Sequence, residues 1–134
     1  MVQHLCVTLV PLFNYLSEDE QIEINQLARH QQFKKNEIIF KPGDEKLNIV
    51  ARGSMKVYQL SPNGKEQLLR VVEPGSYEGE NQLFGIKNET LFGEALETTE
   101  ICSLSKQAFD QVMLRNPQIA LKLFELSKIG RAHV

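Results

Sequence analysis

The sequence lacks any long apolar run. None of its hydrophobic stretches approaches the ~20 residues that a membrane-spanning helix needs. Residues 1–13, MVQHLCVTLVPLF, have no cationic segment ahead of the apolar one and no small-residue cleavage site, so they do not match a secretory signal peptide. We therefore expect no membrane partner and a cytoplasmic location.

An excess of basic residues is also missing. The 134 residues include 15 lysines and arginines against 17 aspartates and glutamates, for a net charge of -2. Nucleic-acid-binding surfaces normally carry a basic stripe or patch, so we do not expect this segment itself to contact DNA. The length and the 42% of hydrophobic residues suit one compact domain.

Cysteine is scarce, with only Cys6 and Cys102 in the chain. Two thiols are too few for a disulfide framework or a four-cysteine metal site, and a cytoplasmic location would keep them reduced. The three histidines, His4, His30 and His133, show no ligand spacing, and we place His30 at the end of the first helix. No nucleophile–base arrangement is recognisable, so we predict neither a metal site nor catalysis.

Turn signals divide the middle of the chain into short β-type segments. A capping-box pattern, Ser17 followed by Glu20, first opens a helix predicted at about residues 18–30. Alternating or β-branched runs then predict strands between turns such as Pro42–Asp44. Strands at this even spacing indicate an antiparallel barrel or roll, so the predicted fold is mainly β with flanking α. The predicted strands are 37–40, 47–51, 55–58, 67–72 and one or two within 93–104.

Two helices are predicted after the strands. Ser105 is suited to cap a short helix, and Pro117 suits the first position of a longer one. In the longer helix Ile119, Leu123 and Leu126 fall at positions i, i+4 and i+7 and form an apolar seam. The seam would pack either on the chain's own roll or on a partner helix in a dimer. The sequence leaves both arrangements open.

Five short segments occur in a recognisable order between these helices. They are Phe40–Asp44 (FKPGD), Gly53–Tyr58 (GSMKVY), Asn63–Gln67 (NGKEQ), Pro74-Gly75 and Gly79-Glu80. With a helix before them and a long helix after them, they resemble the effector domain of the Crp/Fnr superfamily of bacterial transcription regulators. The resemblance covers nearly all the chain. It implies a double-stranded β-helix, or jelly roll, of the cyclic-nucleotide-binding type.

Two more segments resemble the Fnr branch of that superfamily. They are Ala95–Thr98 ahead of Cys102, and His4–Cys6 ahead of Val10–Phe13. Oxygen-sensing members of the branch hold an iron–sulfur cluster on four cysteines, and Cys6 and Cys102 match two of the four. The other two have no counterpart in this sequence. Because a cubane cluster needs four thiolates, we expect no complete iron–sulfur cluster and no other cofactor.

The same resemblance implies that Cys6 and Cys102 lie close together. A disulfide between them would need Cα atoms about 4.4–6.8 Å apart. It would pin a mobile N-terminal arm to the roll, so the pair would act as a thiol–disulfide redox switch. The alternative is that both are ordinary buried thiols, because free cysteine is a common core residue.

Residues 75–93, GSYEGENQLFGIKNETLFG, match the phosphate cassette of the superfamily only in part. Gly79 and Glu80 match the glycine and the glutamate that binds the ribose, but the stretch contains no arginine. Glu89 lies near the place of the arginine that pairs with the phosphate. A carboxylate there repels a phosphodiester, and the lost charge-assisted hydrogen bond costs about 1.5–3 kcal/mol, so we do not expect tight binding of cAMP.

Two interpretations of the cassette stay open. It is either a structural turn or a small-ligand module that binds a nucleotide or another anion, with Lys87 as its basic residue. Gln82 stands where the family usually has glycine and adds a side chain near the ligand position. The candidate ligand residues are Gly75, Gly79, Glu80, Gln82, Lys87, Glu89 and Thr90.

The resemblance also implies a domain organisation. Residues 1–128 would be the sensory effector domain, with a dimerisation helix at about 116–128 that carries the apolar seam. Residues 129–134 are expected to be a non-native or frayed tail, or the end of a short protein. Members of the superfamily continue into a helix-turn-helix domain, which we expect to be absent here. The full-length protein is expected to be a homodimer that contacts DNA only through that domain.

Overall fold

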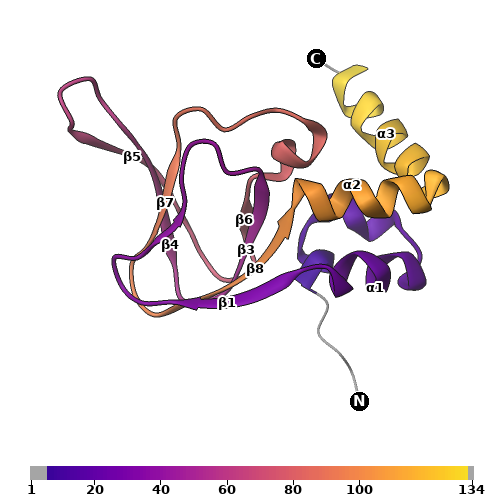
Figure 1. Cartoon of the computed structure of the whole chain (residues 1–134), viewed down its shortest axis with the longest axis horizontal. Coiled ribbons are helices and arrows are strands. Elements are labelled where there is room, and N and C mark those ends of the chain that lie inside the picture. The colour runs from indigo at the N-terminus through magenta and orange to yellow at the C-terminus, as the bar shows by residue number, and fades with distance from the viewer. Residues whose placement is uncertain (1–5, 133–134) are drawn as a thin grey trace.

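The structure is a computed structural model that describes the backbone of residues 6–132 and the side chains of residues 6–125. Figure 1 shows the strands at one end of the molecule and the helices gathered at the other. The helical elements are η1 (Cys6–Leu9), η2 (Pro11–Tyr15), α1 (Glu18–Gln26), η3 (Glu80–Phe84), α2 (Lys106–Arg115) and α3 (Pro117–Ala132). The strands are β1 (Arg29–Phe33), β2 (Ile38–Phe40), β3 (Lys46–Arg52), β4 (Met55–Leu60), β5 (Glu66–Val72), β6 (Tyr77–Glu78), β7 (Phe92–Ala95) and β8 (Thr99–Ser105).

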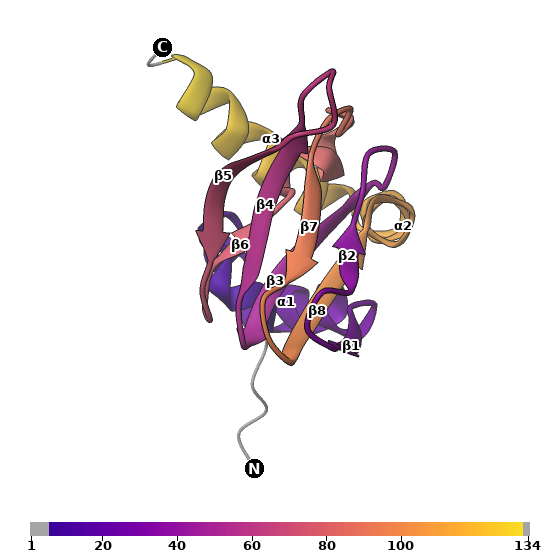
Figure 2. The ribbon, with the colours of Figure 1, turned by 90° about the vertical axis from the view of Figure 1, so that its left-hand side faces the viewer.

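The strands form two four-stranded sheets that pack as a jelly roll. Their orders are β1-β8-β3-β6 and β2-β7-β4-β5, and every neighbouring pair is antiparallel. Figure 2 looks onto the second sheet, with the first sheet and the helices behind it. The predicted fold class, mainly β with flanking helices, is confirmed.

The first sheet covers a hydrophobic core on each of its faces. On β8, Cys102 and Leu104 point into the core shared with the helices, whereas Ile101 points into the core between the sheets. The helix-side core contains Cys6, Val7, Val10, Phe13, Leu16, Ile24, Leu47, Ile49, Leu83, Cys102, Leu104, Phe109, Val112, Ile119 and Leu123. The inter-sheet core contains Ile39, Phe40, Val50, Met55, Val57, Val72, Ala95 and Ile101.

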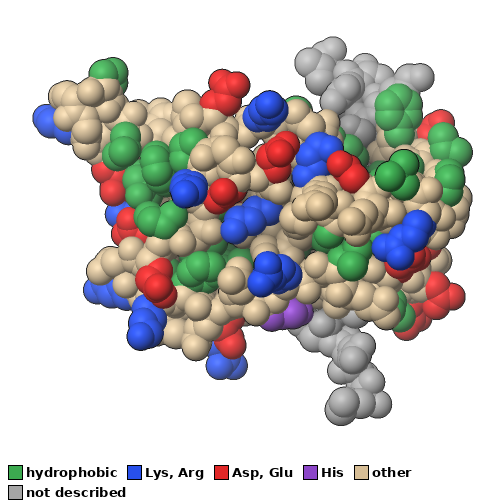
Figure 3. All heavy atoms as spheres, in the orientation of Figure 1, with side chains coloured by type: hydrophobic (Ala, Val, Ile, Leu, Met, Phe, Trp, Pro, Cys, Tyr) green, Lys and Arg blue, Asp and Glu red, His purple; other side chains and the backbone are tan. Residues whose placement is uncertain are grey.

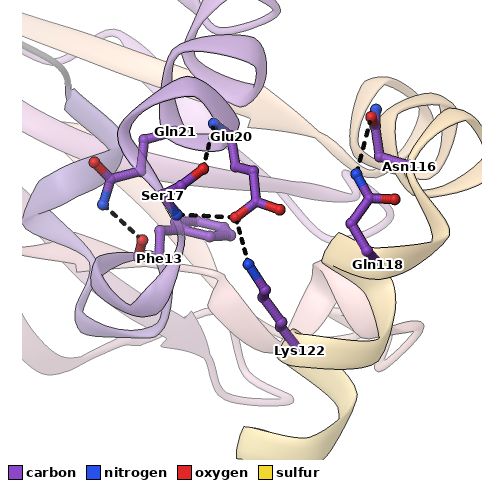
Figure 4. Close-up of polar contacts among 7 residues, drawn as sticks. All are labelled: Phe13, Ser17, Glu20, Gln21, Asn116, Gln118 and Lys122. Carbon is purple, nitrogen blue, oxygen red and sulfur yellow. Dashed lines mark hydrogen bonds and ion pairs between the residues drawn. The ribbon is translucent and has the colours of Figure 1, made fainter.

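Helix α1 begins at the predicted capping box but ends earlier than predicted. The Ser17 hydroxyl accepts a hydrogen bond from the Glu20 N–H at 3.2 Å, and the Glu20 carboxylate accepts one from the Ser17 N–H at 2.9 Å (Figure 4). The helix stops at Gln26, and residues 29–33 form β1 on the edge of the first sheet. The segment RHQQF carries no apolar alternation, so pairing with β8 rather than a local pattern makes it a strand.

Helix α3 begins at Pro117, as predicted, but its apolar seam faces inward. Ile119 and Leu123 are buried in the helix-side core, so of the two arrangements left open by the sequence these residues adopt packing on the roll of their own chain. Leu126 lies outside the residues whose side chains are described. The helical backbone continues to Ala132, past the expected boundary at residue 129.

The described part of the chain bears on two expectations from the sequence, which concern a membrane-spanning helix and a basic surface stripe. Within residues 6–132, no helix combines the length and apolar character that crossing a membrane requires. On the face drawn in Figure 3, basic and acidic side chains are interspersed rather than segregated.

Candidate functional site

Two buried thiols meet at the helix-side core. Cys6 opens η1 and Cys102 lies in the middle of β8, and both are free cysteines with 5% and 0% of their surface exposed. Their sulfur atoms lie within 4.8 Å of each other. The expected proximity of the two cysteines is therefore present in the fold.

A histidine that no sequence pattern predicted lies beside the two thiols. His30 lies on β1 directly opposite Cys102, so the two side chains share one face of the sheet. A ring nitrogen of His30 and both sulfur atoms all lie within 4.8 Å of one another. The expectation that the histidines form no constellation is corrected for His30, while His4 and His133 lie outside the described residues.

The pKa values of the two thiols are shifted in opposite directions. The Cys102 thiol donates a hydrogen bond to the Cys6 sulfur, and this bond lowers the pKa of Cys6 to about 7 against the opposing effect of burial. The same bond, together with burial, raises the pKa of Cys102. Because the thiolate is the nucleophilic form of cysteine, Cys6 is the attacking sulfur of the pair near neutral pH.

The segment that carries Cys6 is packed, not a detached mobile arm as expected from the sequence. Val7, Val10 and Phe13 are fully buried beside Cys6 in the helix-side core. The Val7 N–H donates to the Asn25 side chain at 3.4 Å, which ties η1 to α1. Apolar packing therefore holds η1 and η2 against the first sheet.

The cassette residues line a separate cavity of about 510 Å³ around η3. Of the seven candidate ligand residues, Gly75 alone does not line it, because it lies in the turn before β6. The cavity is lined by Arg70, Tyr77, Glu78, Gly79, Glu80, Asn81, Gln82, Ile86, Lys87, Asn88, Glu89, Thr90 and Leu91. Three carboxylates therefore face two basic side chains, which is a poor environment for a phosphate.

Arg70 is a basic residue of the cavity that was not among the predicted ligand residues. It lies on β5, outside the cassette, and only the folding of β5 beside β6 and η3 brings it to the cavity. Its guanidinium donates to the Tyr77 carbonyl at 2.9 Å and forms an ion pair with Glu78. The arginine is thus already paired with a carboxylate of its own chain, and a phosphate would have to compete with that carboxylate.

Two contacts with the Lys46 backbone explain why the cassette keeps its shape. Gly79 has φ +102°, and a Cβ there would lie 2.4 Å from the Lys46 carbonyl oxygen, so only glycine fits. The Gln82 side-chain oxygen accepts the Lys46 N–H at 3.1 Å, so it anchors η3 to β3. Burial and the neighbouring Glu80 carboxylate raise the pKa of Tyr77, whose hydroxyl donates to Glu80.

The chain is similar to known proteins in family, sequence and fold. The profile of the family described as "Cyclic nucleotide-binding domain" matches residues 30–116. "Probable transcriptional regulator flp" from Lacticaseibacillus casei is 40% identical over 121 residues, which cover 90% of this chain and 55% of that protein. "Regulatory protein HlyX" from Actinobacillus pleuropneumoniae is 32% identical over 83% of this chain and 47% of that protein.

A solved structure with this fold belongs to the N-terminal domain of a transcriptional regulator from Streptomyces coelicolor A3(2). It superposes with a TM-score of 0.79 at 26% identity, covering 92% of this chain and 90% of that chain. This chain spans about half the length of the curated relatives it matches. Those relatives are named as regulators, not as enzymes.

The lowered pKa of Cys6 predicts how thiol reactivity depends on pH. In metal-free, reduced protein, the rate of reaction with a small aromatic disulfide should rise as pH increases through about 7 and then level off, because the Cys6 thiolate is then fully formed. Stopped-flow absorbance of the released thiol measures this rate. In Cys102→Ala the hydrogen bond is lost, so the profile should shift to higher pH. Identical profiles for the two proteins would show that the hydrogen bond from Cys102 does not lower the pKa of Cys6.

Proposed function

The chain belongs to the family of cyclic nucleotide-binding domains, and its relatives are Crp/Fnr-type regulators. We propose that it is the sensor domain of such a transcription regulator. In this proposal Cys6 and Cys102 form a thiol–disulfide switch. The observation that carries the proposal is the position of the two sulfur atoms, which lie within 4.8 Å of each other and share a hydrogen bond. Two thiols at this separation need only a local shift to reach the ~2.05 Å of a disulfide.

The reaction uses an external oxidant such as a peroxide or a low-molecular-weight disulfide. The Cys6 thiolate attacks the oxidant and forms a sulfenic acid or a mixed disulfide. The Cys102 sulfur then attacks Cys6, loses its proton and expels water or the small thiol. Two electrons pass from the sulfur pair to the oxidant, and one intramolecular disulfide is formed.

The effect of the disulfide would reach α3 through η1 and η2. Element η1 contacts α1 and β3, and η2 contacts α3. Figure 4 shows the polar contacts of this region: Gln21 donates to the Phe13 carbonyl at 2.8 Å, and Lys122 of α3 pairs with Glu20 of α1 at 2.9 Å. A shift of Cys6 would therefore be passed to α3 by packed side chains and by these bonds.

The outward face of α3 is the surface we assign to dimerisation. Leu121 and Phe124 are 63% and 60% exposed, although both are large and apolar. A groove beside them is lined by Tyr15, Leu121, Lys122 and Glu125. A second copy of α3 would cover these side chains, so the dimer contact lies on the face opposite the buried seam.

A second candidate function is ligand binding at the η3 cavity, which its size favours. A cavity of about 510 Å³ is within the range that small-molecule ligands occupy. Its three carboxylates and the pairing of Arg70 with Glu78 disfavour an anionic ligand. We therefore place thiol chemistry ahead of cyclic-nucleotide binding.

The switch predicts one intramolecular disulfide after mild oxidation. Reduced, metal-free protein treated with hydrogen peroxide or diamide should lose two hydrogen atoms in mass and yield a Cys6–Cys102 linked peptide on digestion. Cys6→Ser and Cys102→Ser each leave a single thiol and serve as controls that cannot form this bond. Oxidised protein that stays soluble and folded but contains no linked peptide would refute the switch.

The dimer surface is tested by sedimentation of the chain over a range of concentrations. The double variant Leu121→Ser and Phe124→Ser should weaken self-association roughly tenfold or more, because two large apolar side chains lose their buried contact. Leu114→Ser removes a side chain on α2 that is 82% exposed and should leave association unchanged. A monomeric wild type, or equal weakening by Leu114→Ser, would contradict this assignment.

The cavity predicts weak binding of cyclic nucleotides and a route to strengthen it. Isothermal titration of the wild type with cAMP and cGMP should detect no micromolar binding. Glu89→Arg should bind at least about tenfold more tightly than Glu89→Gln, because only arginine adds a charge-assisted hydrogen bond beyond removing the repulsion. Micromolar binding by the wild type would instead put ligand sensing first.

A further inference from the structure

Three metal-binding side chains from three separate elements converge at one point beside the helix-side core. Cys6 comes from η1, His30 from β1 and Cys102 from β8. Their ligand atoms, two sulfurs and one ring nitrogen, all lie within 4.8 Å of one another. Among residues 6–125 this is the cluster of histidine, cysteine and acidic side chains whose ligand atoms come close enough to hold one ion.

The spacing of these atoms suits a thiophilic cation. With Zn–S bonds of about 2.3 Å and tetrahedral angles, two sulfur ligands stand about 3.8 Å apart. The two sulfur atoms therefore need to close by about 1 Å at most from the separation in the structure. Thiolate and imidazole ligands select zinc and similar metals, whereas magnesium and calcium prefer oxygen ligands.

The position of His30 leaves the site open on one side. Cys6 and Cys102 are buried, but His30 lies on the edge strand of the first sheet and is exposed. A metal can therefore enter past the imidazole, and a solvent molecule can complete four-fold coordination. Three protein ligands with one open position are the arrangement found in exchangeable or reactive zinc sites rather than closed structural ones.

We propose that the reduced protein binds one zinc-like cation through the Cys6 and Cys102 sulfurs and a His30 ring nitrogen. Both sulfurs bind the metal as thiolates, so binding releases the protons that the thiols still carry, and no electron is transferred. The site uses the same two sulfurs as the proposed switch, but it does not depend on their oxidation. A disulfide cannot supply thiolate ligands, so metal and disulfide exclude each other. A bound metal thus protects the thiols, and oxidation expels it.

Cobalt and zinc titrations of the full chain test the site directly. Reduced protein, freed of metal by a chelator and handled without oxygen, should take up one Co²⁺ and show thiolate-to-cobalt charge-transfer absorption with the visible bands of a tetrahedral ion. Zinc should displace the cobalt, and competition with a chromophoric chelator gives its affinity. Cys6→Ser and Cys102→Ser should abolish the charge-transfer absorption or strongly reduce it.

His30→Gln is the sharpest variant, because His30 is exposed and its replacement leaves the core packing intact. Zinc affinity should fall roughly tenfold or more, since losing a ligand should cost at least as much as losing a group that orients one. Gln32→Ala is the matched control: Gln32 is exposed on β1, two residues along and on the same face. It should bind zinc as the wild type does. Circular dichroism verifies that both variants are folded.

The outcomes separate the metal site from the switch. Absence of charge-transfer absorption in folded wild type, or unchanged zinc affinity in His30→Gln, would overturn the metal site even if the disulfide forms. Zinc binding that depends on His30, in protein that never forms the linked peptide, would support the metal site and refute the switch. If both hold, zinc-loaded wild type should form the disulfide more slowly than metal-free protein, and equal rates would overturn their mutual exclusion.

Discussion

The register of β8 is the constraint on which the thiol site depends. This strand is paired on both sides, with β1 and with β3, and its side chains alternate between the two cores. At the start of β8, the Thr99 hydroxyl accepts a hydrogen bond from the Ser54 N–H at 3.2 Å and donates one to the Ser54 carbonyl at 3.0 Å. A slip of one residue would turn Cys102 into the inter-sheet core and away from both Cys6 and His30.

The two candidate sites lie apart but are backed by the same core. Element η3 contributes residues to the cavity, and its Phe84 ring meets Phe109 of α2 edge-on, with centroids 5.6 Å apart. The centroid of the Phe109 ring lies 6.3 Å from that of Phe13 on η2, and Phe13 belongs to the same hydrophobic core as Cys6. Because this core is close-packed, we expect a change at either site to shift the helices rather than to be absorbed locally. Both of the proposed functions, thiol chemistry and ligand binding in the cavity, would therefore act on the same element, α3.

Local patterns in the sequence predicted most of the roll and missed what only tertiary pairing creates. Strands β3, β4 and β5 were predictable because β-branched and apolar residues lie between glycine turns. Strand β1 has no such pattern, so His30 was assigned to a helix and its place opposite Cys102 went unseen. Arg70 was missed in the same way, since it reaches the cavity from a neighbouring strand. The apolar seam of α3 was predicted, but the surface against which it packs is determined by the tertiary structure. Ile119 and Leu123 pack into the core of their own chain.

The unequal support of the two cysteines determines which of them moves when a bond forms between the sulfurs. Cys102 is held by hydrogen-bond ladders to β1 and β3, and moving it would break pairing on both sides. Cys6 lies in a single short turn, whose following backbone bonds are Val7–Val10 at 3.1 Å and Val10–Phe13 at 3.0 Å. In the proposed switch the displacement would therefore fall on η1 and η2, which lie against α1 and α3. In the proposed switch or metal site, closing the sulfur pair would pull on the helices and leave the sheet in place. This asymmetry would let a change of bonding at one buried pair reach the outer face of α3.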